Sequence, residues 1–89
     1  MAREADQIAQ DHAAMLGSVS VITSVIATHN KGSDATDEDF GHDMTHDEKK
    51  ARVARSNGYL VHMKALEDWG SESFTEIDAA ISAANSFTA

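Results

Sequence analysis

The sequence predicts a small all-α protein, a single three-helix domain over residues 1–89 with a long, a long and a short helix. Three observations lead to this fold class. Apolar residues recur three and four positions apart in three separate segments, which is the period of a helix. Proline, the strongest helix breaker, does not occur in the chain. A chain of 89 residues is also too short to build a second hydrophobic core.

The first helix is expected over about residues 3–30. Lys31 and Gly32 follow it and supply a cation and a glycine, both suited to a helix C-terminus. Seven β-branched residues between positions 19 and 28 favour a strand as the alternative. We predict a helix because no turn and no second strand stand beside this run. The apolar line of the helix is Ile8, Met15, Val19, Ile22 and Ile26.

An acidic loop is expected over residues 31–44, and a second helix over about residues 45–69. Phe40 is expected to anchor the loop to the core. Thr45 and Glu48 form the pattern of a capping box, in which each side chain bonds an amide of the other residue at a helix start. A line of residues at helical spacing is predicted to face the core: Ala51, Ala54, Gly58, Val61, Ala65 and Trp69.

The third helix is expected over about residues 74–86. Ser73 and Glu76 repeat the spacing of a capping box, which places a helix start there. The apolar face of this helix is predicted to consist of Phe74, Ile77, Ile81 and Ala84.

The formal net charge of −8 indicates that nucleic acids and anionic membranes are not direct partners, since both attract clustered cations. The most apolar stretch, residues 15–27, is shorter than the roughly 20 residues that span a bilayer. The N-terminal residues also lack the pattern of a signal peptide. We therefore expect a soluble protein, in the cytoplasm or within a virion or other large assembly.

Charge is distributed unevenly in the middle of the chain. Seven carboxylates occur in residues 34–48, and four of the seven Lys and Arg residues follow in residues 49–55. Small and apolar residues cover more than half the circumference of the first helix between residues 13 and 27, which is wider than one neighbouring helix requires. These two features predict a protein interface that includes Gly17, Val21, Val25, Asp37, Asp39, Lys49, Lys50, Arg52 and Arg55.

The acidic segment also contains weak candidates for metal ligands. His42 and His46 stand four residues apart, and a histidine pair with this spacing on a helix can hold a transition metal. Five residues match positions 1, 3, 7, 9 and 12 of the calcium-binding loop: Asp37, Asp39, Asp43, Thr45 and Glu48. The template requires an oxygen ligand and a glycine next to each other, where this chain has Gly41 and His42. We therefore predict no metal site.

An enzymatic function is not expected. The chain has no cysteine nucleophile and no glycine-rich phosphate loop, and nothing in the sequence requires a cofactor. A helical domain of this size also rarely encloses a pocket of the roughly 300 Å³ that small molecules occupy.

The resulting hypothesis is a non-enzymatic protein that binds copies of itself or a larger scaffold, such as an accessory component of a phage particle or a similar assembly. A different class remains as the alternative: a small acidic inhibitor whose carboxylates occupy a basic, nucleic-acid-binding cleft of a target protein. A third alternative is a helical module that depends on a calcium or zinc ion bound within residues 37–48.

Overall fold

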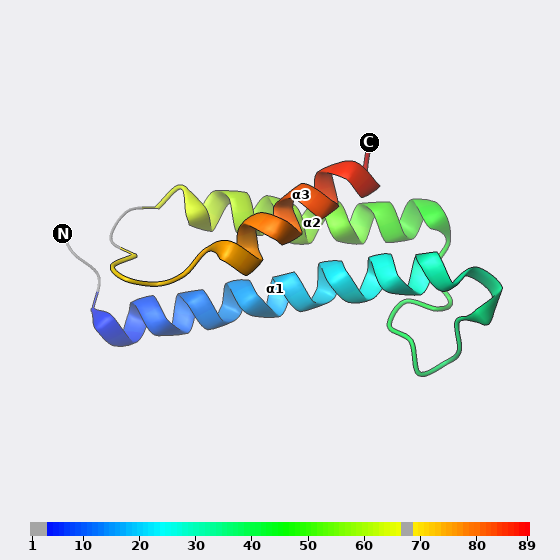
Figure 1. Ribbon diagram of the computed structural model, residues 1–89, viewed down its shortest axis with the longest axis horizontal. Coiled ribbons are helices and arrows are strands. Elements are labelled where there is room, and N and C mark those ends of the chain that lie inside the picture. The colour runs from blue at the N-terminus through cyan, green and yellow to red at the C-terminus, as the bar shows by residue number, and fades with distance from the viewer. Residues whose placement is uncertain (1–3, 67–68) are drawn as a thin grey trace.

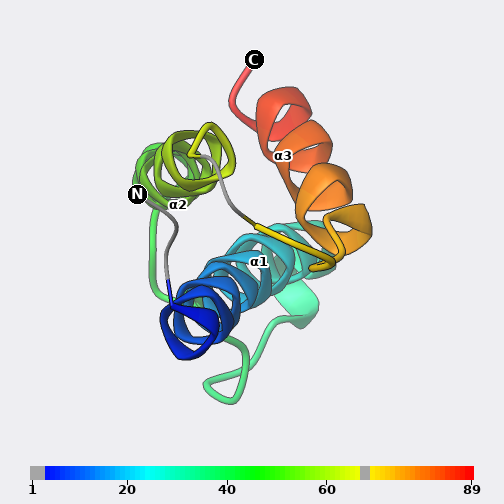
Figure 2. The ribbon, with the colours of Figure 1, turned by 90° about the vertical axis from the view of Figure 1, so that its left-hand side faces the viewer.

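Three helices form the domain, and the fold class predicted from the sequence is confirmed. The computed structural model describes residues 4–66 and 69–89. Helix α1 spans Ala5–Lys31, a 3-10 turn η1 spans Gly32–Asp34, and helices α2 and α3 span His46–Lys64 and Thr75–Phe87. No strand occurs within the described residues. The helices α2 and α3 lie side by side along the same side of α1 (Figures 1 and 2).

The core lies where the three helices meet. Its buried side chains come from all three helices and the segment after α2, and they are Met15, Ile22, Val25, Val53, Leu60, Trp69, Ile77, Ala80 and Ala84. Helix α1 alone has 27 residues and is therefore about 40 Å long. Its length explains the elongated shape of the molecule, which measures 49 × 25 × 18 Å.

The β-branched run of residues 19–28 is helical, as predicted. Ile22 and Val25 are fully buried in the core, and this packing outweighs the local preference for a strand. The hydroxyl of Thr28 donates to the carbonyl of Ser24 at 2.8 Å, which satisfies a buried polar group within the helix itself. Gly32 follows the helix with a φ of 56°, a left-handed conformation that glycine adopts without strain.

The capping box predicted at the start of α2 is confirmed. The amide of Glu48 donates to the Thr45 hydroxyl at 3.1 Å, and the amide of Thr45 donates to the Glu48 carboxylate at 2.8 Å. The second predicted capping box is wrong. Phe74 occupies the N-cap position of α3 with no side-chain cap, because Ser73 lies one residue too early. The Ser73 hydroxyl accepts from the Thr75 amide at 3.4 Å, and the Ser73 carbonyl accepts from His12.

The predicted core face of α2 is wrong. Four members of the line are exposed, namely Ala51, Ala54, Gly58 and Ala65, and Val61 is 50% exposed. The buried face runs instead through Val53, Ser56 and Leu60. Both lines have helical spacing, and the structure buries the one with the larger side chains because it removes more apolar surface from water.

Helix α2 also ends earlier than predicted, at Lys64 rather than near residue 69. Trp69 lies beyond the helix, and its indole Nε1 donates to the Met63 carbonyl at 3.2 Å, which satisfies an acceptor of the last helical turn. The ring of Trp69 packs edge-on against the ring of Phe74, with the ring centroids 5.4 Å apart. The side chain of Trp69 therefore joins the core, as expected, but from the connection between α2 and α3.

Candidate protein-binding surfaces

The side of α1 that faces away from α2 and α3 carries no charge over most of its length. Between Asp11 and Lys31 the sequence contains no Asp, Glu, Lys or Arg. The helix nevertheless exposes one side to solvent, and a solvent-exposed helix face normally carries charged residues. We call this side the outer face of α1, and its exposed residues are Ala9, Ala13, Gly17, Ser20, Thr23 and Ala27.

The three interface candidates on α1 do not share one environment. Gly17 lies on the outer face, and a Cβ atom built there would meet nothing within 4 Å. Val21 is half-buried and packs against the core. Val25 is fully buried, so its assignment to an interface is wrong. Its side chain belongs to the intramolecular core, and its Cγ2 lies close to Gly41 of the loop.

The cations at the start of α2 are not neutralised within the described residues. The Glu48 carboxylate, four residues before Arg52, bonds the Thr45 amide instead, and Arg52 donates to the Ser56 hydroxyl at 3.1 Å. Lys49 and Lys50 are half-buried and Arg55 is exposed. None of these four cations forms an ion pair among residues 4–66 and 69–89.

The acidic loop holds most of its carboxylates in solvent. The exception is Asp39, whose carboxylate accepts from Lys31 Nζ at 2.6 Å and from the Thr36 amide at 2.9 Å. The hydrogen bond from Lys31, followed by that from Thr36, lowers the pKa of Asp39 below its ordinary value. Phe40 is 49% exposed, so the prediction that it anchors the loop to the core is wrong. The exposed carboxylates of the loop belong to Asp34, Asp37, Glu38 and Asp43.

The structure does not bring the candidate metal ligands together. Glu48 is engaged in the capping box, and Asp39 bonds Lys31. His42 lies in the loop, whereas His46 stacks on a histidine of α1. Within residues 4–66 and 69–89 no group of three or more His, Cys, Asp or Glu side chains is placed to hold an ion.

A cluster of three rings joins the ends of the helices, and helical periodicity in the sequence does not indicate it. His29 of α1 stacks on His46 of α2 with ring centroids 4.4 Å apart, and Phe87 of α3 packs edge-on against both. Desolvation within this cluster lowers the pKa of His29, and the nearby His46 and Lys49 lower it further. The sequence could have indicated this contact, because His29 lies near the end of one helix and His46 at the start of the next, and antiparallel packing brings these two ends together.

The lowered pKa of His29 predicts a loss of stability on mild acidification. The folded state binds fewer protons than the unfolded state, so its stability is full above about pH 6.5 and falls as the pH drops through the lowered pKa. Urea unfolding of the wild type and of His29→Gln between pH 5 and 8 measures this effect. As the pH falls, the free energy of unfolding of the wild type should decrease more than that of His29→Gln. A difference that stays constant over this range would contradict the assignment to His29.

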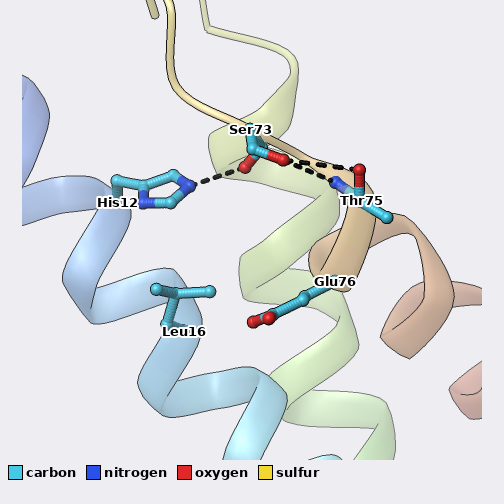
Figure 3. A pocket seen from close by; sticks show the side chains of 5 residues that line it. All are labelled: His12, Leu16, Ser73, Thr75 and Glu76. Atoms are coloured by element: carbon cyan, nitrogen blue, oxygen red, sulfur yellow. Dashed lines mark hydrogen bonds between the residues drawn. The ribbon is translucent and has the colours of Figure 1, made fainter.

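A hollow with polar groups lies between α1 and the start of α3. It has a volume of about 290 Å³ and is lined by His12, Leu16, Ser73, Thr75 and Glu76 (Figure 3). His12 Nε2 lies 2.7 Å from the Ser73 carbonyl, and its Nδ1 lies 3.4 Å from the Glu72 carboxylate. Through these two contacts His12 helps to hold the segment before α3 on α1.

A second hollow of about 350 Å³ is mostly apolar and lies between α2 and α3, lined by Val61, Lys64, Ala65 and Ile81. These two hollows reach the size that small molecules occupy, which was not expected from the length of the chain. Both are open depressions at the surface of the domain.

Helix α1 and the turn after it have the length and composition of a membrane span. An 18-residue stretch within Ala5–Asp34 has a mean hydropathy of 1.2, and 22% of that stretch is buried inside the domain. The expectation from the sequence considered residues 15–27 alone, whereas the helix continues on both sides of that stretch. The core helix of a soluble protein can have the same length and the same apolar composition.

Comparison with known proteins adds no relative: no family model, no curated protein and no solved structure matches this chain.

Proposed function

We propose that this protein is a non-enzymatic assembly component that binds protein, its own copies or a larger scaffold, through the outer face of α1. The observation that carries the proposal is the absence of charge on an exposed helix side from residue 12 to residue 30. Charged residues are depleted at the cores of protein interfaces, whereas ordinary solvent-exposed helix faces are rich in them. An accessory role in a phage particle or a similar assembly fits a helical domain of this size.

The proposal includes a soluble state for the folded domain. Met15, Ile22 and Val25 pack against α2 and α3 in the core, so insertion of α1 into a bilayer would require the helix to leave that core.

The proposed function predicts that Ser20→Glu disrupts assembly. Ser20 is exposed on the outer face, so the added carboxylate leaves the fold intact but places a charge in the interface. Light scattering coupled to size-exclusion chromatography should show wild-type species larger than the 9.6 kDa monomer and a monomeric variant. The matched control is Ser82→Glu on the exposed side of α3, which should assemble like the wild type. A monomeric wild type, or assembly that Ser20→Glu leaves unchanged, would contradict the proposal.

A second candidate function is an acidic inhibitor of a basic cleft. It is favoured by the exposed carboxylates of Asp34, Asp37, Glu38 and Asp43, which form no ion pair with other residues of the described ranges 4–66 and 69–89. Such a protein would be a monomer at every concentration, and its association rate with a cationic target would fall steeply as salt is added.

A further inference from the structure

The side of α2 that faces away from α1 is an unpartnered helix face. Its exposed residues recur at steps of three and four over 14 positions, which is the pattern of a helix seam that packs against another helix. The apolar hollow of about 350 Å³ lies at its edge, between Val61 and Ile81. We call this face the α2 stripe, and it consists of Ala51, Ala54, Gly58, Val61 and Ala65.

Unpaired cations flank the N-terminal half of the α2 stripe. Lys50 lies four residues before Ala54, and Arg55 lies three residues before Gly58, so both side chains neighbour the stripe on the helix surface. Neither forms an ion pair within the described part of the chain. A partner that covers the stripe therefore gains from carboxylates at this end.

The molecule offers such carboxylates on its opposite side. Figures 1 and 2 place the acidic loop on the side of α1 away from α2 and α3, next to the C-terminal end of the outer face of α1. The outer face is therefore an uncharged helix surface with acids at one end. The α2 stripe has Lys50 and Arg55 beside its N-terminal half, where Asp47 is also exposed, and these two cations complement the acids of the loop.

We propose that the partner of the α2 stripe is a second copy of this chain, bound through its outer face of α1. The inference rests on the proposed function and specifies the partner and the surface. The stripe is about 21 Å long and the outer face about 27 Å, at a rise of about 1.5 Å per residue, so one fits on the other. An antiparallel arrangement of the two helices brings Lys50 and Arg55 of one copy to the acidic loop of the next.

This arrangement determines the kind of assembly. The two surfaces differ and lie on opposite sides of the molecule, so each contact leaves one free surface of each kind. Contacts of this heterologous type continue into open chains or close into rings. The oppositely charged ends set the direction in which each copy is added.

The test uses two variants, each of which blocks one surface. Ser20→Glu blocks the outer face of α1 and leaves the α2 stripe intact, whereas Ala54→Glu blocks the stripe and leaves the outer face intact. Each variant alone should be a monomer in light scattering. An equimolar mixture should form a one-to-one dimer of twice the 9.6 kDa monomer mass. Formation of this dimer on mixing shows that both variants are folded, because a misfolded chain would supply no binding surface.

A control and a salt series complete the experiment. Ala83→Glu, the same change on the exposed side of α3, should assemble like the wild type. Raising the salt to 1 M, where charges are screened beyond about 3 Å, should weaken assembly of the wild type without abolishing it. If Ala54→Glu assembles like the wild type while Ser20→Glu does not, the inference is wrong and the proposed function survives. If Ser20→Glu also assembles, or the wild type is monomeric, both are wrong.

Discussion

Replacement of Ile22 or Ile77 by alanine is expected to destabilise the domain by about 2–5 kcal/mol. Both side chains are fully buried, one in the middle of α1 and the other in the first turns of α3. Removal of three carbons leaves a cavity among rigid helices that relax only in part. Because small domains have a free energy of unfolding of about 5–15 kcal/mol, this loss removes a large fraction of the stability.

Urea unfolding followed by circular dichroism, at one protein concentration, measures this effect. Ile81→Ala is the matched control for Ile77→Ala, since the same substitution is made one turn later at a half-buried position. It should cost clearly less than Ile77→Ala. A cost below about 0.5 kcal/mol for both Ile22→Ala and Ile77→Ala would place neither side chain in the core.

Leu60→Ala and Val61→Ala are expected to differ strongly although the residues are adjacent. Leu60 is fully buried and Val61 is 50% exposed. The first substitution should cost about 2–5 kcal/mol. The second should be nearly neutral, since the loss of two methyl groups at the surface is offset by the higher helix propensity of alanine, worth about 0.5 kcal/mol.

This pair decides which face of α2 is the core. A chain that buried the line predicted from the sequence would show the reverse order, with Val61→Ala costing more than Leu60→Ala. The comparison should be made in the Ser20→Glu background, because binding of a second copy to the α2 stripe would add to the measured stability of the wild type.

The elements that the sequence predicted well are those with a local physical cause. The start of α2 follows from hydrogen bonds between Thr45 and Glu48, two residues three positions apart. The end of α1 follows from Gly32, whose positive φ is intrinsic to the residue. The face of α3 was identified because Ile77 and Ala84 lie on the only line of that helix with large apolar members.

The predictions that failed depend on distant contacts. Trp69 lies beyond the end of α2, and its indole donates to the Met63 carbonyl, a contact that helical spacing does not indicate. The false capping box at Ser73 arose because its spacing is right, while in the folded chain His12 bonds the Ser73 carbonyl from 61 residues away. Side-chain volume could have identified the buried face of α2, because Leu60 and Val53 are larger than Ala54 and Gly58.

The candidate surfaces were predicted only in part. Gly17 lies on the outer face of α1 as expected, and Lys50 and Arg55 remain unpaired among the described residues. Val25 was misassigned because the period of a helix identifies an apolar stripe but not which edge of it a neighbour covers. The α2 stripe was recognised as an apolar line but was assigned to the wrong environment.

The sequence by itself determined the helices, because capping, propensity and periodicity act over a few residues. It also determined the separation of acids from cations and the absence of charge between residues 12 and 30. The tertiary structure decided which of the two lines of α2 is buried, and which carboxylates remain unpaired among residues 4–66 and 69–89. It also placed the acidic loop and the α2 stripe on opposite sides of the molecule. The reason is physical: burial is a competition between faces for one common core, and its outcome depends on all three helices together.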